Sequence, residues 1–212
     1  MSEKDKPKTW RERFRFSRTT ETPVGGQDSE HPINAFARHV EVTALSPAQF
    51  VQLLETLDML GKTGAGIELS SLSTEVLVDV VHRASKEQIK AIGEHEELRA
   101  VFIDEIFRRM SDHFVPERAR NIDLVVSWRF TPGDGDDGFD RFQTVIEDGI
   151  CVSGEDLDRA PDTTITLAAE DFIRMATGTV AVATMFVTGK VKVKGEYAPA
   201  VRFSSYFDLP QP

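Results

Sequence analysis

The feature that most constrains the fold is a long uncharged run near the C-terminus. No Asp, Glu, Lys or Arg stands between Arg174 and Lys190, although charged residues make up 28% of the sequence. A helix that spans a bilayer needs about 20 apolar residues, so residues 175–189 are too few to cross a membrane. Gly178 and several threonines also interrupt the run. We therefore expect residues 175–189 to be a buried segment of a globular domain.

Alternating side chains predict several strands around this run. Lysine and valine alternate from Lys190 to Lys194, which is typical of a strand with Val191 and Val193 facing inward. Asp148-Gly149 predicts a tight hairpin turn. Strands in sequence with flanking helices, and no βαβ repeat, indicate an α+β domain with a mainly antiparallel sheet. The predicted strands span residues 122–130, 139–147, 150–153, 163–167 and 190–194.

Helices are predicted for the N-terminal half and around the uncharged run. Ser46 before Pro47 favours a helix start, and Ser85 with Gln88 is typical of a capping box. The helix expected over residues 96–114 is apolar around half its circumference. We therefore expect this helix to lie wedged between other elements. Its apolar residues are Leu98, Phe102, Ile103, Ile106, Phe107, Met110 and Phe114.

The charge and cysteine content exclude several classes of protein. The net charge of −10 argues against nucleic acid as a partner, because phosphate contacts need a basic surface. A single cysteine forbids disulfides within the chain, and a cytoplasmic location is the simplest expectation. Residues 1–31 are polar and basic in their first part, which predicts a flexible tail. Weak contact of residues 6–18 with an anionic membrane surface is a hypothesis.

Two motifs resemble ligand sites but lack required residues. The GKT at residues 61–63 would need glycine at position 56, where Thr56 stands, and a strand before it. The acidic run of residues 134–140 has Phe139 where a calcium loop needs glycine, and Val145 where it needs a carboxylate. We expect neither a nucleotide site nor a calcium site.

The chain carries no recognisable catalytic or metal-binding pattern. Its five histidines show no metal-ligand spacing, and one cysteine cannot complete a local zinc set. Cys151 falls in a predicted strand, which favours a buried structural thiol over a nucleophile. We therefore expect no catalytic residues, no metal and no cofactor.

The C-terminal half resembles the sterol carrier protein two family. The matching stretches are Thr164-Ile165-Thr166-Leu167, Glu170-Asp171-Phe172, Ala176-Thr177-Gly178, Phe186, and the Gly-Lys-Val-Lys-Val-Lys-Gly of residues 189–195. The resemblance extends over about residues 94–212. It implies a five-stranded sheet covered by helices on one side, with an apolar tunnel between them. It also implies non-catalytic binding and transfer of sterols, fatty acyl chains or acyl-CoA.

The resemblance also indicates which residues would line the tunnel. Family members often carry glutamine before the Gly-Lys pair, where this chain has Thr188. This difference predicts a more apolar pocket, or one with only hydroxyl donors. The predicted lining residues are Phe107, Met110, Phe114, Trp128, Phe172, Met175, Ala176, Val182, Met185, Phe186, Thr188, Val191 and Val201.

Residues 32–93 lie outside the resemblance and leave two alternatives open. They predict a small all-helical extension before the sterol-carrier-like domain of residues 94–212. This extension could be a protein-interaction module, with a homodimer through its helices as one form. The chain could also be an enzyme, or an accessory protein to one, that acts on hydrophobic metabolites.

Overall fold

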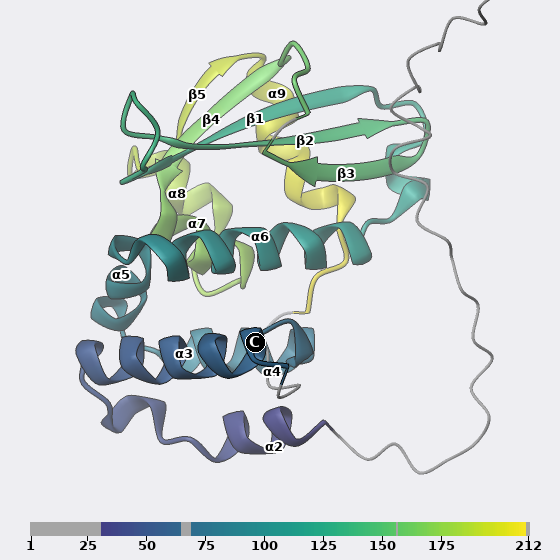
Figure 1. The fold of residues 1–212 in the computed structure, drawn as a ribbon. Coiled ribbons are helices and arrows are strands. Elements are labelled where there is room, and N and C mark those ends of the chain that lie inside the picture. Colours follow the sequence, from purple (N-terminus) through teal and green to yellow (C-terminus); the bar gives the residue numbers. More distant parts are fainter. Residues whose placement is uncertain (1–30, 65–68, 156, 211–212) are drawn as a thin grey trace, which may run out of the picture. The chain divides into compact units, whose positions relative to one another are not determined.

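The computed structural model describes residues 31–64, 69–155 and 157–210. Residues 31–212 form one compact unit, in which helices lie against one face of a five-stranded sheet (Figure 1). The predicted basic tail and its membrane contact at residues 6–18 lie outside the described residues. The helices are α2 (Pro32–His39), α3 (Pro47–Lys62), α4 (Thr74–Arg83), α5 (Lys86–Glu94), α6 (Glu96–Asp112), α7 (Ala169–Ala176), α8 (Val182–Val187) and α9 (Tyr197–Arg202). The strands are β1 (Leu124–Thr131), β2 (Asp140–Glu147), β3 (Ile150–Gly154), β4 (Thr163–Ala168) and β5 (Lys192–Gly195).

The sheet is mixed, which corrects the expectation of a mainly antiparallel sheet. Its strand order is β3-β2-β1-β4-β5, and β1 pairs with β4 in parallel while the other neighbours are antiparallel. After β3 the chain crosses over β2 and β1 and joins the sheet again as β4, which lies beside β1. Asp162 holds this connection, because its carboxylate accepts a hydrogen bond from the Val125 N–H at 2.8 Å. Side-chain alternation predicts which face is buried, but it carries no information on strand order.

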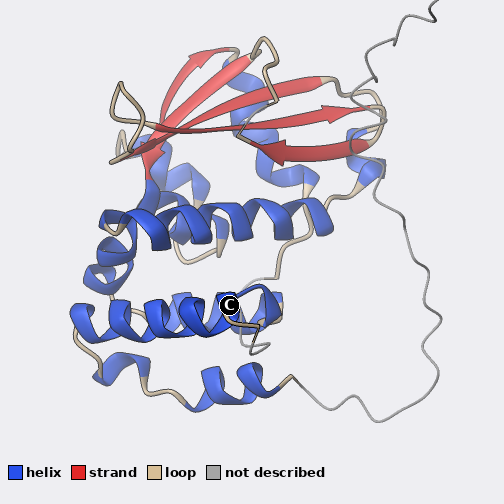
Figure 2. Cartoon of the chain, viewed as in Figure 1, coloured by secondary structure: helices blue, strands red, loops and turns tan. Residues whose placement is uncertain are grey.

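The buried face of the sheet is the one that the helices cover (Figure 2). Leu124, Val126, Trp128 and Phe130 of β1 point to this face and are buried. Alternation in the sequence predicted this orientation, and the structure confirms it. The β1–β2 register places Phe142 opposite Trp128, so aromatic side chains gather at the centre of the sheet.

Capping interactions begin the helices where the sequence predicted. Ser46 and Ser85 each accept a hydrogen bond from the N–H three residues on, while Gln49 and Gln88 bond back to the serine N–H. These are the reciprocal bonds of a capping box. The helices α3 and α5 therefore start at the residues expected from local chemistry.

Helix α6 is wedged between the other helices and the sheet, as predicted. It contacts α5, α7 and β3, and it buries polar as well as apolar side chains. Arg109 is buried and donates hydrogen bonds to the Leu72 carbonyl at 2.7 Å and to Glu105 at 2.7 Å. Arg99 is also buried and binds the carboxylates of Asp134 and Asp140. One helix thus ties the N-terminal helices and the β1–β2 loop to the same core.

One apolar core runs through both predicted parts of the chain. Ile89 and Ile92 of α5 belong to the same buried cluster as Phe172 of α7, and both α4 and α5 contact α7. The boundary between residues 93 and 94 stays a prediction, as does the separate role of the helical extension.

The uncharged run of residues 175–189 is mostly not buried, so the expectation of a buried segment was wrong. Within it only Thr177 and Met185 are buried, and Val187 is 88% exposed. The run forms a turn at Gly178 and the six-residue helix α8, in which only Met185 is buried. Among the described residues, no helix is long and apolar enough to cross a membrane.

The buried Glu105 predicts how stability depends on pH. Burial alone would raise the pKa of Glu105, but hydrogen bonds and charge from Arg108 and Arg109 outweigh it and lower that pKa below 4.5. A lowered folded-state pKa contributes stability above the unfolded value and loses it as pH falls through the folded value. Urea unfolding should therefore show stability decreasing below pH 4.5.

The free energy of unfolding of Glu105→Gln should fall less steeply with decreasing pH than that of the wild-type protein. It should also be lower than the wild-type value at neutral pH. Asp112→Asn is the matched control, because Asp112 also binds Arg108 on α6 but is exposed. The pH dependence of its free energy of unfolding should stay close to that of the wild type. If the free energy of unfolding fell equally steeply below pH 4.5 in Glu105→Gln and in the wild-type protein, this account would be contradicted.

Candidate functional site

A layer of aromatic rings fills the space between the sheet and the helices. Phe107 of α6 lies 5.1 Å from Phe172 of α7 and 5.3 Å from Phe142 of β2, measured between ring centroids. Phe172 lies 4.9 Å from Phe130, and Trp128 lies 5.1 Å from Phe203. Such tilted and offset pairs are favourable beyond the area they bury. We call Phe107, Trp128, Phe130, Phe142, Phe172 and Phe203 the aromatic layer.

A row of hydroxyl groups crosses the buried face of the sheet beside the aromatic layer. Trp128 Nε1 donates a hydrogen bond to Thr144 Oγ1 at 3.1 Å, and Thr144 Oγ1 lies 2.9 Å from Ser153 Oγ. Thr163 stands in the same row, because Thr144 and Thr163 flank Val126 on neighbouring strands. Thr163 Oγ1 is buried without a hydrogen-bond partner among the described residues. We call Ser153, Thr144 and Thr163 the hydroxyl row.

Helix α8 covers the end of this space with few anchoring contacts. Met185 is its one buried residue, and no side chain caps its N-terminus. Lys190, after the helix, binds the buried carboxylate of Asp171 at 2.5 Å. Gly178 and Gly189, on either side of α8, both have positive φ, which glycine adopts without strain.

The structure brings some of the predicted lining residues together and leaves others apart. Phe107, Trp128 and Phe172 meet in the aromatic layer. Phe186 instead packs on Tyr197 at 5.4 Å, and the exposed Thr188 hydroxyl donates to the Thr184 carbonyl of its own helix. Contact of these residues with a ligand stays a prediction. The buried members are Phe107, Met110, Trp128, Phe172, Met185 and Val191; Phe114, Met175, Ala176, Val182 and Phe186 are half-buried, and Thr188 and Val201 are exposed.

Reasoning from the sequence did not place Phe130, Phe142 and Phe203 at the site. Alternation along β1 already oriented Phe130 towards the core, so that residue could have been included. Phe142 depends on the β1–β2 register, and Phe203 begins a four-residue 3₁₀ helix after α9 that is too short to show a periodic pattern. Thr144 and Thr163 were missed because isolated threonines in strands are common.

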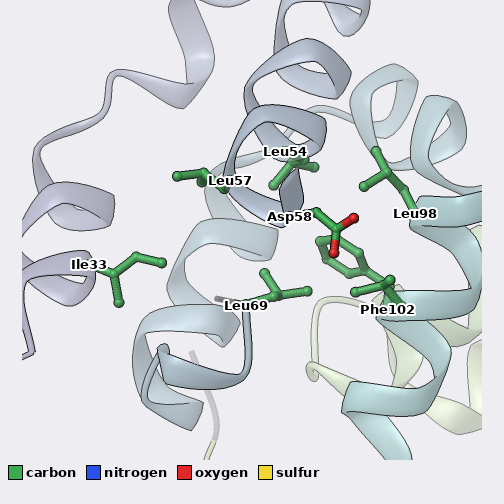
Figure 3. Close-up of a pocket in the computed structure, with 8 residues that line it drawn as sticks. Ile33, Leu54, Leu57, Asp58, Leu69, Leu98 and Phe102 are labelled. Carbon is green, nitrogen blue, oxygen red and sulfur yellow. The ribbon is translucent and has the colours of Figure 1, made fainter. Parts of the chain in front are cut away.

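Two hollows lie among the helices, away from the aromatic layer. The first is an apolar pocket between α3 and α6 with room for about 10 Å³, and Asp58 points into it (Figure 3). That is roughly the space of one water molecule. The second, of about 320 Å³, adjoins it on the surface. The tunnel implied by the resemblance is not shown and stays a prediction. The first pocket is lined by Ile33, Leu54, Leu57, Asp58, Leu69, Leu98, Val101 and Phe102.

Cys151 lies on the helix-facing side of β3, where the register pairs it with the buried Ile146. Burial raises the pKa of its thiol to about 12, despite a hydrogen bond with Ser111 that lowers it. The thiolate is the reactive form of cysteine, so this environment suppresses nucleophilic chemistry.

A family comparison becomes informative once this geometry is known. The model of the SCP-2 sterol transfer family matches residues 103–208, which hold most of α6, the whole sheet and the aromatic layer. The chain belongs to the SCP-2 sterol transfer family. Lipid binding and transfer are therefore the class of function to which its C-terminal half is assigned.

The chain is also similar to curated proteins and to solved structures. Hydroxysteroid dehydrogenase-like protein 2 is 33% identical over 101 residues in Rattus norvegicus and 32% in Mus musculus, each match covering 47% of this chain. The matched part is only 18% and 20% of those relatives, so their whole activity is not carried over. Sterol carrier protein 2 like 2 of Aedes aegypti is 19% identical, with a TM-score of 0.38 over 50% of this chain and 93% of its own. The sec-alkylsulfatase Pisa1 from Pseudomonas sp. is 18% identical, with a TM-score of 0.44 over 84% of this chain and 32% of its own.

The raised pKa of Cys151 predicts slow thiol modification. In the native protein at mildly alkaline pH, maleimide should label Cys151 far more slowly than it labels the urea-unfolded chain. The sequence holds one cysteine, so labelling reports on this site alone. Mass spectrometry over time gives the rates. Native labelling as fast as unfolded labelling would show that the thiol is not protected.

Proposed function

We propose that the chain is a non-catalytic carrier that binds lipids or other hydrophobic small molecules between the sheet and its helices. The observation that carries this proposal is the family match over residues 103–208, because these residues enclose the aromatic layer. The layer is apolar, and Arg99, Glu105 and Arg109, the buried charged side chains of α6, have partners of their own. An uncharged ligand body is therefore the fitting occupant.

Binding requires the aromatic rings to move apart, and α8 is the element best placed to allow it. The short α8 is anchored mainly by Met185, and glycines with positive φ stand on both sides of it. Displacing α8 would expose Met185 and Phe186, but it would leave the sheet ladder intact. We therefore assign the route of ligand entry to the α8 end of the layer.

The hydroxyl row supports a particular ligand chemistry. Thr163 Oγ1 lacks a partner among the described residues, and a buried hydroxyl without one is costly. A ligand that offers a hydroxyl or carbonyl oxygen could satisfy it. Sterol-like or isoprenoid alcohols and protonated fatty acids have this chemistry, whereas a permanently charged head group would meet no buried counter-ion there.

Quenching of Trp128 by a brominated fatty acid tests the proposed site. The sequence has two tryptophans, so Trp10→Phe leaves Trp128 as the one reporter. A chain-brominated fatty acid should quench Trp128 saturably, because bromine quenches only at contact and Trp128 is buried in the layer. Unlabelled fatty acids and sterols that reverse the quenching would rank the ligand classes.

Trp128→Phe, which retains Trp10, is the control and should show no saturable quenching. Quenching that is equal in the two variants would indicate ligand on the outside of the protein. No quenching of Trp128 by fatty acid, sterol or isoprenoid would refute a ligand site between sheet and helices.

A second candidate function is protein interaction through the N-terminal helices, with a homodimer as its simplest form. Met59 of α3 is 65% exposed, and Leu60 and Phe36 are exposed as well. Sedimentation velocity should then show a dimer that Met59→Glu converts to a monomer, while Ile150→Glu, at an exposed site on β3, leaves the dimer intact. A wild-type monomer at all concentrations tested would exclude this form of interaction.

A further inference from the structure

The face of the sheet opposite the helices carries positive charge on adjacent strands. Side chains alternate along β1, so Arg129 points away from the helices while its neighbours Trp128 and Phe130 point towards them. The register places Thr166 of β4 beside Arg129, and Lys192 of β5 beside Thr166. Arg129, Thr166 and Lys192 therefore form a row across the outer face of the sheet (Figure 2).

A second row of polar side chains runs beside the first. Ser127 pairs with Thr164, and Thr164 pairs with Lys194, each two positions along its strand from the first row. Residues two apart on a strand share a face and lie about 7 Å apart. Both rows thus place a hydroxyl group next to a lysine. We call Ser127, Arg129, Thr164, Thr166, Lys192 and Lys194 the cationic face.

The charges of the cationic face have no counter-ions. Strands β1, β4 and β5 contain Arg129, Lys192 and Lys194 but no Asp or Glu, although the whole chain has 35 acidic residues against 25 Lys and Arg. Lys192 and Lys194 are exposed, and Arg129 is half-buried. In the part of the chain that the structure describes, none of these three cations forms an ion pair. The cationic face is therefore a positive patch on a protein of net charge −10.

The surroundings of Arg129 leave its guanidinium poorly satisfied. Its Nε is buried and has no hydrogen-bond partner among the described residues, and Cζ lies 5.8 Å from the centroid of the Phe139 ring. The register sets Arg129 directly opposite Arg141 of β2, and like charges in such pairs destabilise a sheet. Arg141 is neutralised by Asp137, whereas Arg129 has no carboxylate of its own. If the Arg129 side chain turned outward to an anionic acceptor, both defects would be relieved.

We propose that the cationic face docks an acidic segment of a partner protein. A carboxylate accepts two parallel hydrogen bonds from a guanidinium, which would give Arg129 the acceptor that it lacks. Alternate side chains of an extended segment lie about 7 Å apart, so carboxylates at every second position match the spacing of Lys192 and Lys194. The hydroxyls of Thr164 and Thr166 stand beside the two lysines and can donate to the same carboxylates. Charge complementarity thus identifies the partner by its carboxylates.

Other anionic occupants fit the cationic face less well. A membrane surface is bound through apolar side chains that enter it, and the six residues of this face include none. Nucleic acid is held by many phosphate contacts and, when single-stranded, by stacking on aromatic rings, whereas this face offers three cations and no aromatic residue. In a twofold contact with a second copy the same patch would meet itself, so cations would face cations.

Docking at the cationic face is independent of the proposed carrier function. The aromatic layer lies on the opposite side of the sheet, between the sheet and the helices. An acidic segment could therefore dock whether or not a lipid is bound.

Fluorescence anisotropy of a labelled peptide, titrated with the full chain, tests this proposal. The probe is a ten-residue peptide of alternating glutamate and serine, and its control has glutamine in place of glutamate. The protein should bind the acidic peptide more tightly than the control, and added salt should weaken that binding. Because the chain as a whole repels an acidic peptide, such binding has to be local.

Substitutions locate the binding on the molecule. Lys192→Gln with Lys194→Gln should lower the affinity for the acidic peptide about 5-fold. Arg129→Gln should lower it about 10-fold, because a charge-assisted pair is lost. Lys86→Gln with Lys90→Gln on α5 makes the same charge change as the first variant away from the cationic face, and should lower the affinity far less. Urea unfolding checks that each variant is folded.

Equal affinity for the acidic peptide and its control, or equal losses in the lysine variant and the α5 variant, would overturn the proposal. Tighter binding of phosphatidylserine vesicles or of oligothymidylate per unit of negative charge, lost in the same lysine variant, would overturn it in favour of a membrane or a nucleic acid. A wild-type dimer that Lys192→Gln with Lys194→Gln dissociates would overturn it in favour of a second copy. The Trp128 quenching assay measures ligand binding separately, so either proposal can fail without the other.

Discussion

The burial of α6 on opposite sides is the constraint on which the rest of the structure depends. A surface helix needs only one apolar stripe, whereas α6 contacts helices on one side and the sheet on the other. Phe107 enters the aromatic layer, while Arg109 reaches the Leu72 carbonyl beside α4. Because buried charge is tolerated only when it is paired, Glu105 has to accompany Arg109 on the same helix. The N-terminal helices and the sheet consequently share one core.

Local chemistry made much of this architecture predictable from the sequence. The half-circumference apolar pattern identified α6 as a wedge, since no exposed face could carry so many large apolar side chains. Ser46 before Pro47 located the start of α3, and Ser85 followed three residues later by Gln88 located the start of α5, because both signals are complete within four residues. Alternation oriented Trp128 inward, and the Lys-Val repeat with its neighbours indicated the family. Each of these features depends on residues close together in the chain.

The features that could not be predicted depend on which segments become neighbours. Strand order decides that β1 pairs in parallel with β4, and register decides that Phe142 meets Trp128. The absence of charge between Arg174 and Lys190 says nothing about what covers those residues, and in α8 three of the six residues are exposed. A run without charge therefore has two physical explanations, a buried wall or a surface that meets something apolar, and only the fold separates them.

One physical argument explains both the closed packing of the aromatic layer and the exposure of α8. Ring pairs are each favourable by ~0.5–1.5 kcal/mol beyond burial, so an empty interior closes on itself rather than leaving a void. An acyl chain gains ~0.8 kcal/mol for each buried CH₂, so a long chain can replace several ring contacts. Such an exchange needs a wall that yields without loss of the sheet, and α8 fits that requirement because Met185 is its one buried residue. In the proposed carrier, weak anchoring and apolar exposure of α8 have the same origin: a segment that has to leave the core to admit a ligand cannot be fully buried in it.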